Sequence, residues 1–366
     1  MVYNKFGDHN PNGMIYVLKK DSARIRKKAM ELFKQPVPQP YEEVRPLVIR
    51  ANVGDIIQVN FENKLDRPAS IHVQGMCYDV LTSDGSNVGY NPDSTARRFI
   101  RYTWHADKEG VFLFSDMGNT RSNEEGTNVH GLFGAIIVEA AGSEWFDPVT
   151  GKPLESGLFA DIYNPAKPAF REYAVFFHDE LEIRNKDGEQ PIDPHTGLPN
   201  GTTAISYRSE PMRNRPPLAP HADTAEDISM SSWAYGDPCT PILETYPGEP
   251  IRIRLLDGAH EEQHIFNIEG MPWRKEITDV KSPLVQAQTI GISEAFNLHI
   301  DEPYPAGDYL YYSGGIDDLW LGLWGIIRAY ATPQRHLLPL CGFKPICPPQ
   351  MPPKGAVIRK FEVEAI

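Results

Sequence analysis

The chain has 366 residues, of which 41% are hydrophobic and 23% charged, and this is enough for two domains that each bury a core. Its net charge of −13 disfavours binding to nucleic acid and to anionic membrane surfaces. No segment reaches the roughly 18 apolar residues that a membrane-spanning helix needs. Residues 1–20 lack the pattern of a secretory signal, so we expect a cytoplasmic protein with neither a membrane nor a nucleic acid as partner.

The N-terminal part of the chain predicts an arm followed by a β-rich domain. Residues 1–40 form the arm, with one helix over residues 21–35 that ends at a run of prolines. Residues 41–141 form the first domain, because short alternating segments separated by turn residues are typical of a β-sandwich. The strands expected in this domain cover residues 46–62, 70–75, 98–104, 110–114 and 132–139.

The C-terminal part predicts a second domain of the same kind. Residues 142–170 are rich in glycine, proline and aspartate and are expected to be a linker. Residues 171–332 form the second domain, and a long irregular excursion runs through it over residues 184–229. Its strands are expected at residues 172–178, 251–256, 264–269, 295–300, 308–312 and 323–330. Residues 333–366 form a proline-rich tail.

The two predicted domains share a sequence pattern. Residues 45–55 are echoed by residues 240–250, and the segment Ile71-His-Val-Gln-Gly75 is echoed by Phe266-Asn-Ile-Glu-Gly270. Two further apolar strands of the first domain also have counterparts in the second. Such self-similarity indicates that one β-sandwich occurs twice in the chain.

These echoed segments carry a resemblance to the multicopper oxidase family, because the sequence framework around the four copper motifs of that family is present here in the same order. The resemblance covers roughly residues 45–330 and is strongest to the two-domain laccase and bacterial manganese-oxidase branches. It implies an all-β fold of two cupredoxin-like Greek-key β-sandwiches. Because two-domain laccases place their copper cluster between neighbouring subunits, the resemblance also implies a homotrimer.

Most of the residues that bind copper in this family are replaced here. The first motif reads His72-Val-Gln-Gly75 and the second Ser115-Asp-Met117. The third reads His264-Ile-Phe-Asn-Ile-Glu-Gly270, and the fourth Ser313-Gly-Gly-Ile-Asp-Asp-Leu319. Only His72 and His264 remain, and type 1 copper needs a thiolate that the fourth motif lacks. We therefore expect neither a metal nor another cofactor, and no laccase activity.

The replaced positions should still converge on a cavity, because the fold that carried the copper cluster is retained. Glu269, His72 and Asp116 are the predicted catalytic residues, since a carboxylate in such a cavity would have a raised pKa. The predicted substrate-binding residues are Gln74, Ser115, Met117, Asn267, Ser313 and Tyr78. His264, whose copper partners are missing, is expected to be a hydrogen-bonded core histidine.

The leading functional hypothesis is a copper-independent enzyme that acts on a small organic, biosynthetic substrate by acid–base chemistry. The reaction would be an isomerisation, cyclisation, dehydration or hydrolysis. A second hypothesis is a non-catalytic binding or scaffold protein, which apolar replacements such as Met117 and Leu319 favour. A third is an oxidoreductase with an atypical metal site.

Overall fold

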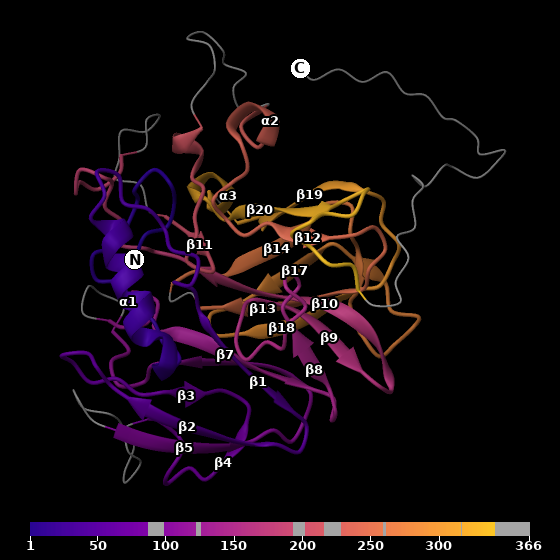
Figure 1. Ribbon diagram of the computed structural model, residues 1–366, viewed down its shortest axis with the longest axis horizontal. Helices are drawn as coiled ribbons and strands as arrows, with labels where there is room; N and C mark the ends of the chain where they lie inside the picture. Colours follow the sequence, from indigo (N-terminus) through magenta and orange to yellow (C-terminus); the bar gives the residue numbers. More distant parts are fainter. Residues whose placement is uncertain are drawn as a thin grey trace, which may run out of the picture.

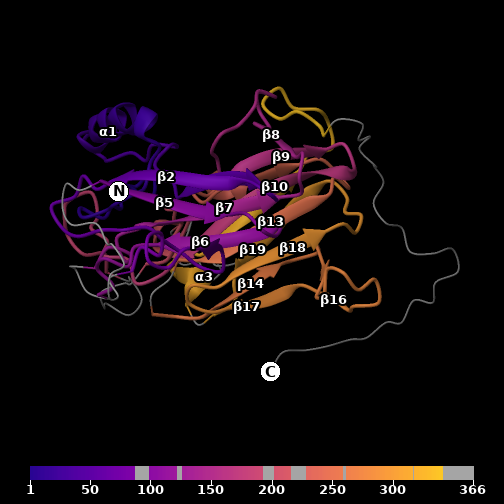
Figure 2. The ribbon, with the colours of Figure 1, turned by 90° about the horizontal axis from the view of Figure 1, so that it is seen from below.

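Stacked β-sheets make up most of the molecule (Figures 1 and 2). The computed structural model describes residues 1–86, 99–121, 126–192, 202–215, 228–258, 261–315 and 317–340. The expected all-β architecture of two cupredoxin-like sandwiches is confirmed.

The first sandwich packs a four-stranded sheet against a three-stranded sheet. The four-stranded sheet has the order β1 (Leu47–Asn52), β7 (Phe133–Glu139), β6 (Gly110–Ser115), β3 (His72–Val73). The three-stranded sheet has the order β2 (Ile56–Glu62), β5 (Phe99–His105), β4 (Cys77–Tyr78). Their facing side chains form one apolar core that includes Trp104 and Phe114, both fully buried.

The second sandwich has larger sheets. One contains β18 (Ala295–Ile300), β13 (Ile251–Asp257), β10 (Lys167–His178), β9 (Phe159–Asn164) and β8 (Glu144–Phe146), with β11 (Ala204–Ile205) paired to β10. The other contains β12 (Leu243–Thr245), β20 (Trp324–Ala329), β19 (Gly307–Ser313), β14 (His264–Ile268) and β17 (Ala287–Ile290). A small hairpin pairs β15 (Trp273–Arg274) with β16 (Leu284–Val285).

The segment expected to be a linker, residues 142–170, is instead part of this second sandwich. It supplies β8, β9 and the first residues of β10. β9 pairs antiparallel with both β8 and β10, so its backbone polar groups are satisfied within the sheet. The glycines and prolines that suggested a linker lie mainly in the turns between these strands.

The internal repeat is visible in the strand pairing. β1 runs parallel to β7, and β12 runs parallel to β20 in the same way. Across the sheet, β7 is followed by the antiparallel strands β6 and β3, just as β20 is followed by β19 and β14 in the second sandwich. Gly75 and Gly270 end the equivalent strands β3 and β14 with φ of 75° and 77°, a conformation that glycine adopts without strain.

β7 is the wall between the two sandwiches. All seven of its residues are buried, because one face packs in the first core and the other against the second sandwich. The interface cluster includes Ile137 from β7 and Phe176 from β10. A buried ion-pair network crosses the same interface. Glu172 accepts hydrogen bonds from Arg50 at 2.5 Å and Arg254 at 2.8 Å, and Arg254 also binds Glu139.

The N-terminal segment packs on the sandwiches rather than forming a free arm. Tyr3 is fully buried in the interface cluster, and Tyr16 lies in the first core. The predicted helix is confirmed as α1 (Lys19–Phe33). Three short helical turns follow: η1 (Met212–Asn214), α2 (Ser232–Tyr235) and α3 (Asp318–Leu321). Among the described residues, no helix has the length and apolar character to cross a membrane. Residues 341–366 of the predicted tail lie outside the described residues.

Candidate functional site

His72 lies where β3 pairs with the end of β6, directly opposite Ser115. Its Nδ1 is 2.7 Å from the backbone carbonyl oxygen of Asp84, and 3.6 Å from a carboxylate oxygen of the same residue. A carbonyl oxygen can only accept, so Nδ1 carries the proton and Nε2 is left as an acceptor when the ring is neutral. Nε2 makes no hydrogen bond within the described part of the chain, and the side chain is 21% exposed.

Asp84 also contacts Tyr78, so three polar side chains gather at this point. The Tyr78 hydroxyl donates to Asp84 at 3.0 Å, and burial followed by this hydrogen bond raises the pKa of Tyr78 to about 12. Burial acts to raise the pKa of Asp84, but hydrogen bonds from Ser86 and Tyr78 and the nearby His72 hold it below its usual value. The cluster therefore combines a carboxylate that stays charged with an oriented imidazole.

His72 and Tyr78 are among the residues predicted from the sequence, whereas Asp84 is not. The backbone explains why these residues meet: Gly85 has a φ of 74°, and a Cβ atom there would lie 2.1 Å from the carbonyl oxygen of Ile71. Only glycine permits this close approach, which brings Asp84 beside His72. The Asp-Gly pair shortly after the first motif is a turn signal that could have suggested the contact.

Asp116, predicted as a catalytic residue, is fully buried, and its carboxylate is hydrogen-bonded to the turn that follows it. Its carboxylate accepts hydrogen bonds from the backbone N–H groups of Ser70 (2.6 Å), Gly118 (2.9 Å) and Asn119 (3.0 Å), and from the Thr127 hydroxyl. These contacts give the carboxylate a structural role and leave it little capacity to contact a substrate.

The other predicted residues of the first sandwich, Gln74, Ser115 and Met117, differ in their exposure to solvent. Ser115 is buried, Gln74 is half-buried, and Met117 is 38% exposed. The backbone N–H of Met117 donates to the Ser70 hydroxyl, which ties this turn to the strand end. Gln74 and Met117 thus keep accessible surface, whereas Ser115 keeps little.

The predicted residues of the second sandwich form a separate group on β14 and β19. The carboxylate of Glu269 is exposed, and it accepts a hydrogen bond from Tyr312 at 3.0 Å. Asn267 donates to the carbonyl oxygen of Ile265 at 2.8 Å. The Ser313 hydroxyl, fully buried, donates to Asp318 at 2.5 Å. The burial that was expected of Glu269 is therefore not provided by a single chain.

The two groups do not meet within one chain. β3 and β6 belong to the first sandwich, and β14 and β19 lie in the outermost sheet of the second (Figure 1). Among the described residues, no hydrogen bond or ion pair joins His72 to Glu269. The single chain therefore does not bring together the predicted residues of the two sandwiches.

His264 is a fully buried core histidine, as expected. Its Nδ1 is 2.9 Å from Asp318, and its Nε2 is 3.8 Å from Asp179. Burial acts to lower the pKa of His264, but the hydrogen bond to Asp318 and the charges of Asp257, Asp318 and Asp179 outweigh burial and raise it. The buried carboxylates around His264 thus favour its protonated form.

The residues at the former ligand positions do not fit a copper centre. Gly314 and Gly315 have no side chains, and a Cβ atom at Gly315 would lie 2.4 Å from a carboxylate oxygen of Asp318. Asp318 thus fills space beside His264 and occupies its Nδ1. Across the described ranges, no group of three or more histidine, cysteine, aspartate or glutamate side chains is arranged to hold a metal ion.

Comparison with known proteins supports the resemblance seen in the sequence. Residues 42–143 match the family model of a multicopper oxidase domain. A probable nitrite reductase-hydroxylamine oxidoreductase fusion protein from Kuenenia stuttgartiensis is 33% identical over 152 residues, which are 39% of this chain and 15% of that protein. Coagulation factor V from Bos taurus is 26% identical over 151 residues, 38% of this chain and 7% of that protein. The chain thus spans only a small part of these relatives.

Solved structures show the same fold. A crystal structure of a multicopper oxidase aligns with a TM-score of 0.50 at 16% identity, covering 77% of this chain and 78% of that one. Copper nitrite reductase from Nitrosomonas europaea aligns with a TM-score of 0.51 at 18% identity, covering 79% and 85%. The multicopper oxidase resemblance is confirmed, with the family-model match limited to the first sandwich.

Proposed function

We propose that this chain, with its multicopper-oxidase-like fold, is a copper-independent enzyme that acts on a small organic molecule by acid–base chemistry. The observation that carries the proposal is the arrangement of His72. Its Nδ1 is held by the carbonyl oxygen of Asp84, its Nε2 makes no hydrogen bond to a described residue, and the side chain is 21% exposed. Histidine orientated in this way is a common general base in enzymes.

The chemistry follows from these contacts. Nε2 of His72 would accept a proton from a substrate carbon or hydroxyl and return it at a neighbouring atom of the substrate. The carboxylate of Asp84, 3.6 Å from Nδ1, would stabilise the imidazolium that forms. Tyr78 keeps Asp84 in place through its hydrogen bond. Isomerisation, cyclisation, dehydration and hydrolysis fit this machinery, because each needs proton transfer and none needs an oxidant.

The second group of predicted residues has a place in this proposal if the chain forms a homotrimer. Asn267 and Glu269 lie at the C-terminal end of strand β14, and Glu269 is exposed. A neighbouring subunit that covers this strand end with its first sandwich would bring Glu269 toward His72 and bury it. Glu269 would then serve as the second acid–base group, and Gln74, Met117 and Asn267 would contact the substrate.

The test compares matched histidine variants in a metabolite extract from the organism that encodes the chain. Metal-depleted protein should convert one compound to a product of equal mass, or to one that differs by a water molecule. His72→Gln should lower turnover by about 100-fold or more. His105→Gln is the control, because His105 is exposed on β5. Mass spectrometry of the extract reads the outcome, and light scattering of the same samples checks the trimer.

Two results would contradict the proposal. Turnover that is unchanged in His72→Gln would exclude this histidine as the base. Stoichiometric copper in the purified protein, with turnover that depends on it, would return the chain to oxidase chemistry. Saturable ligand binding without any turnover would instead favour the second candidate, a non-catalytic binding protein, which the cavity lined by Leu158, Phe159 and Tyr173 also supports.

A further inference from the structure

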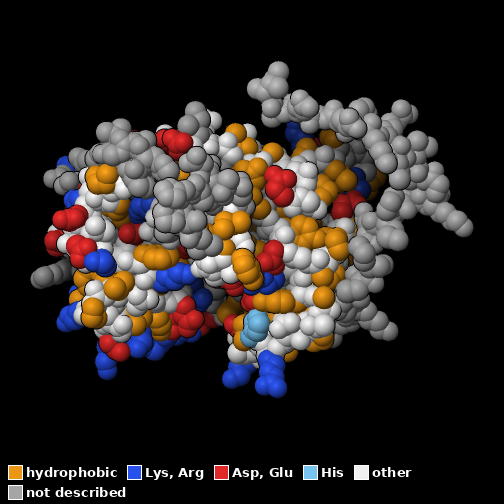
Figure 3. Space-filling view, turned by 90° about the horizontal axis from the view of Figure 1, so that it is seen from above, with side chains coloured by type: hydrophobic (Ala, Val, Ile, Leu, Met, Phe, Trp, Pro, Cys, Tyr) orange, Lys and Arg blue, Asp and Glu red, His pale blue; other side chains and the backbone are white. Residues whose placement is uncertain are grey.

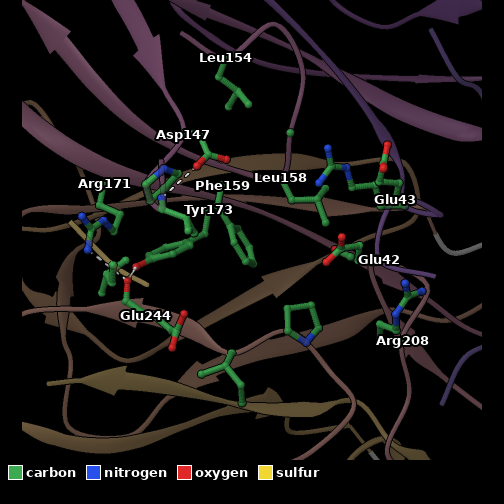
Figure 4. Close-up of a pocket in the computed structure, with 18 of the residues that line it drawn as sticks. Glu42, Glu43, Asp147, Leu154, Leu158, Phe159, Arg171, Tyr173, Arg208 and Glu244 are labelled. Carbon is green, nitrogen blue, oxygen red and sulfur yellow. Dashed lines mark hydrogen bonds between the residues drawn. The ribbon is translucent and has the colours of Figure 1, made fainter. Parts of the chain in front are cut away.

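A cavity of about 610 Å³ lies in the second sandwich, where the segment 42–45 that leads into the first sandwich closes it, and no residue near His72 lines it. Its walls come from residues 42–45, residues 147–159, strand β10, residues 206–208 and residues 239–244 (Figure 4). This volume falls within the range of roughly 300–1,000 Å³ that small-molecule sites occupy. None of the residues assigned to the proposed catalytic site lines it.

One part of the cavity wall is apolar. Leu158 and Phe159 project into it in Figure 4, and Leu154 and Tyr173 lie beside them. Tyr173 is buried, and its hydroxyl donates to the carbonyl oxygen of Glu244, so it presents its ring rather than its polar end. This surface suits an aromatic or aliphatic body of a ligand.

Several of the charged side chains around the cavity already have partners. Arg171, at one side in Figure 4, forms ion pairs with Asp161 at 2.8 Å and Glu249 at 2.9 Å. Glu244 accepts from Tyr330 and lies 2.9 Å from His336. Glu43 binds Arg24. These groups therefore need no ligand.

Two arginines at the opposite side have no carboxylate partner. The Arg208 guanidinium donates only to backbone carbonyl oxygens, those of Val44 (3.1 Å), Tyr207 (2.8 Å) and Tyr41 (2.6 Å). Arg45 lines the same cavity and makes neither a hydrogen bond nor an ion pair with any described residue. Burial, the largest influence on both, lowers the pKa of Arg45 and lowers that of Arg208 to about 10.

Acidic side chains near these arginines do not replace a partner. Glu42, Glu43 and Asp147 act on Arg45 through space, but none comes within ion-pair distance of its guanidinium. Asp147 uses one carboxylate oxygen to cap its own turn, accepting from the N–H groups of Val149 and Thr150. The cavity thus joins an apolar surface to the half-buried Arg45 guanidinium, whose donors make no hydrogen bond to a described residue.

We propose that this cavity binds a small organic anion, a carboxylate with an aromatic or aliphatic body. The carboxylate would accept paired hydrogen bonds from Arg45, an arrangement for which the planar guanidinium is well suited. Arg208 would add positive charge behind it, and Leu158 and Phe159 would contact the body. The site is independent of His72, so its failure would leave the proposed function untouched.

The experiment titrates the full chain with 3-phenylpropionate by calorimetry, with 3-phenylpropionamide and inorganic phosphate as comparison probes. We expect saturable binding of the carboxylate, with the neutral amide and phosphate at least about tenfold weaker. Arg45→Met should weaken carboxylate binding by about tenfold or more and leave amide binding unchanged. Arg101→Met is the matched control, because Arg101 is exposed on β5 and binds only Asn60.

Arg45→Lys distinguishes loss of the site from loss of the fold, since it keeps the charge and should retain part of the affinity. Thermal melting of each variant verifies that it is folded. The proposal is wrong if acid and amide bind equally, if Arg45→Met binds 3-phenylpropionate as the natural sequence does, or if none of the probes binds. Phosphate binding as tight as that of 3-phenylpropionate would also overturn it, because the apolar surface would then contribute nothing.

Discussion

Two sets of arginines near the junction of the two sandwiches differ in their burial and in their partners. At the level of β1, β10 and β13, Arg50 and Arg254 share the carboxylate of Glu172, and all three side chains are nearly inaccessible. At the cavity, Arg45 has no partner and Arg208 has only backbone carbonyl oxygens. The same region therefore holds one compensated set of charges and one uncompensated set.

The difference separates structural charge from charge available for recognition. Removing a guanidinium from water is unfavourable unless another group replaces the lost interactions. Glu172 provides that replacement inside the protein, and its pKa is lowered to about 2 because Arg50 and Arg254 outweigh the effect of burial. The arginines of the cavity keep partial contact with solvent instead, which leaves them free for an external anion.

The largest effect on stability is expected from Glu172→Gln, which removes the carboxylate shared by the two compensated arginines. This change leaves Arg50 and Arg254 buried without their shared counter-charge, so we expect a loss of about 3–5 kcal/mol in the free energy of unfolding. Urea denaturation at neutral pH measures it. Glu155→Gln is the control, since its exposed ion pair with Lys20 should contribute little to stability. Equal losses in the two variants would show that water or another group compensates the arginines.

A smaller effect is expected from the second carboxylate of the network, Glu139. Burial, together with the nearby Glu172, raises the pKa of Glu139 to about 7, although Arg254 opposes this. The folded state therefore binds a proton more tightly than the unfolded state, whose pKa is about 4.5. Stability from this group is present below pH 4.5 and is lost as the pH rises toward 7.

Glu139→Gln isolates this contribution, because glutamine cannot titrate. Relative to the natural sequence, the variant should become more stable by about 1–3 kcal/mol as the pH rises from 4.5 to 7. Urea denaturation across this pH range gives the difference. A difference that does not change with pH would mean that Arg254 keeps Glu139 ionised throughout.

The smallest effect on stability is expected at the cavity. Arg45→Met removes no hydrogen bond and no ion pair, so the free energy of unfolding without ligand should change by less than about 0.5 kcal/mol. A loss as large as that of Glu172→Gln would show that Arg45 is structural and would remove the contrast between the two regions.

Most of the strands could be predicted from the sequence, because alternation along β5 and the echoed motifs report burial locally. The pairing of β8 and β9 could not, since a segment rich in glycine and proline reveals nothing about the strand it will join. The role of Asp116 was also hidden, as its partners Ser70 and Thr127 are distant in sequence. The exposure of Glu269 depends on whether another subunit covers it, which no single sequence specifies.

The position of β7 between the two sandwiches determines how substitutions in this strand affect the protein. Because its side chains alternate between two cores, a substitution at Ile136 is felt by the first sandwich, and one at Ile137 by both. Neither half can be exchanged, duplicated or lost on its own without exposing a continuous apolar surface. The two sandwiches therefore depend on the same strand, and a substitution in β7 can lower the stability of both at once.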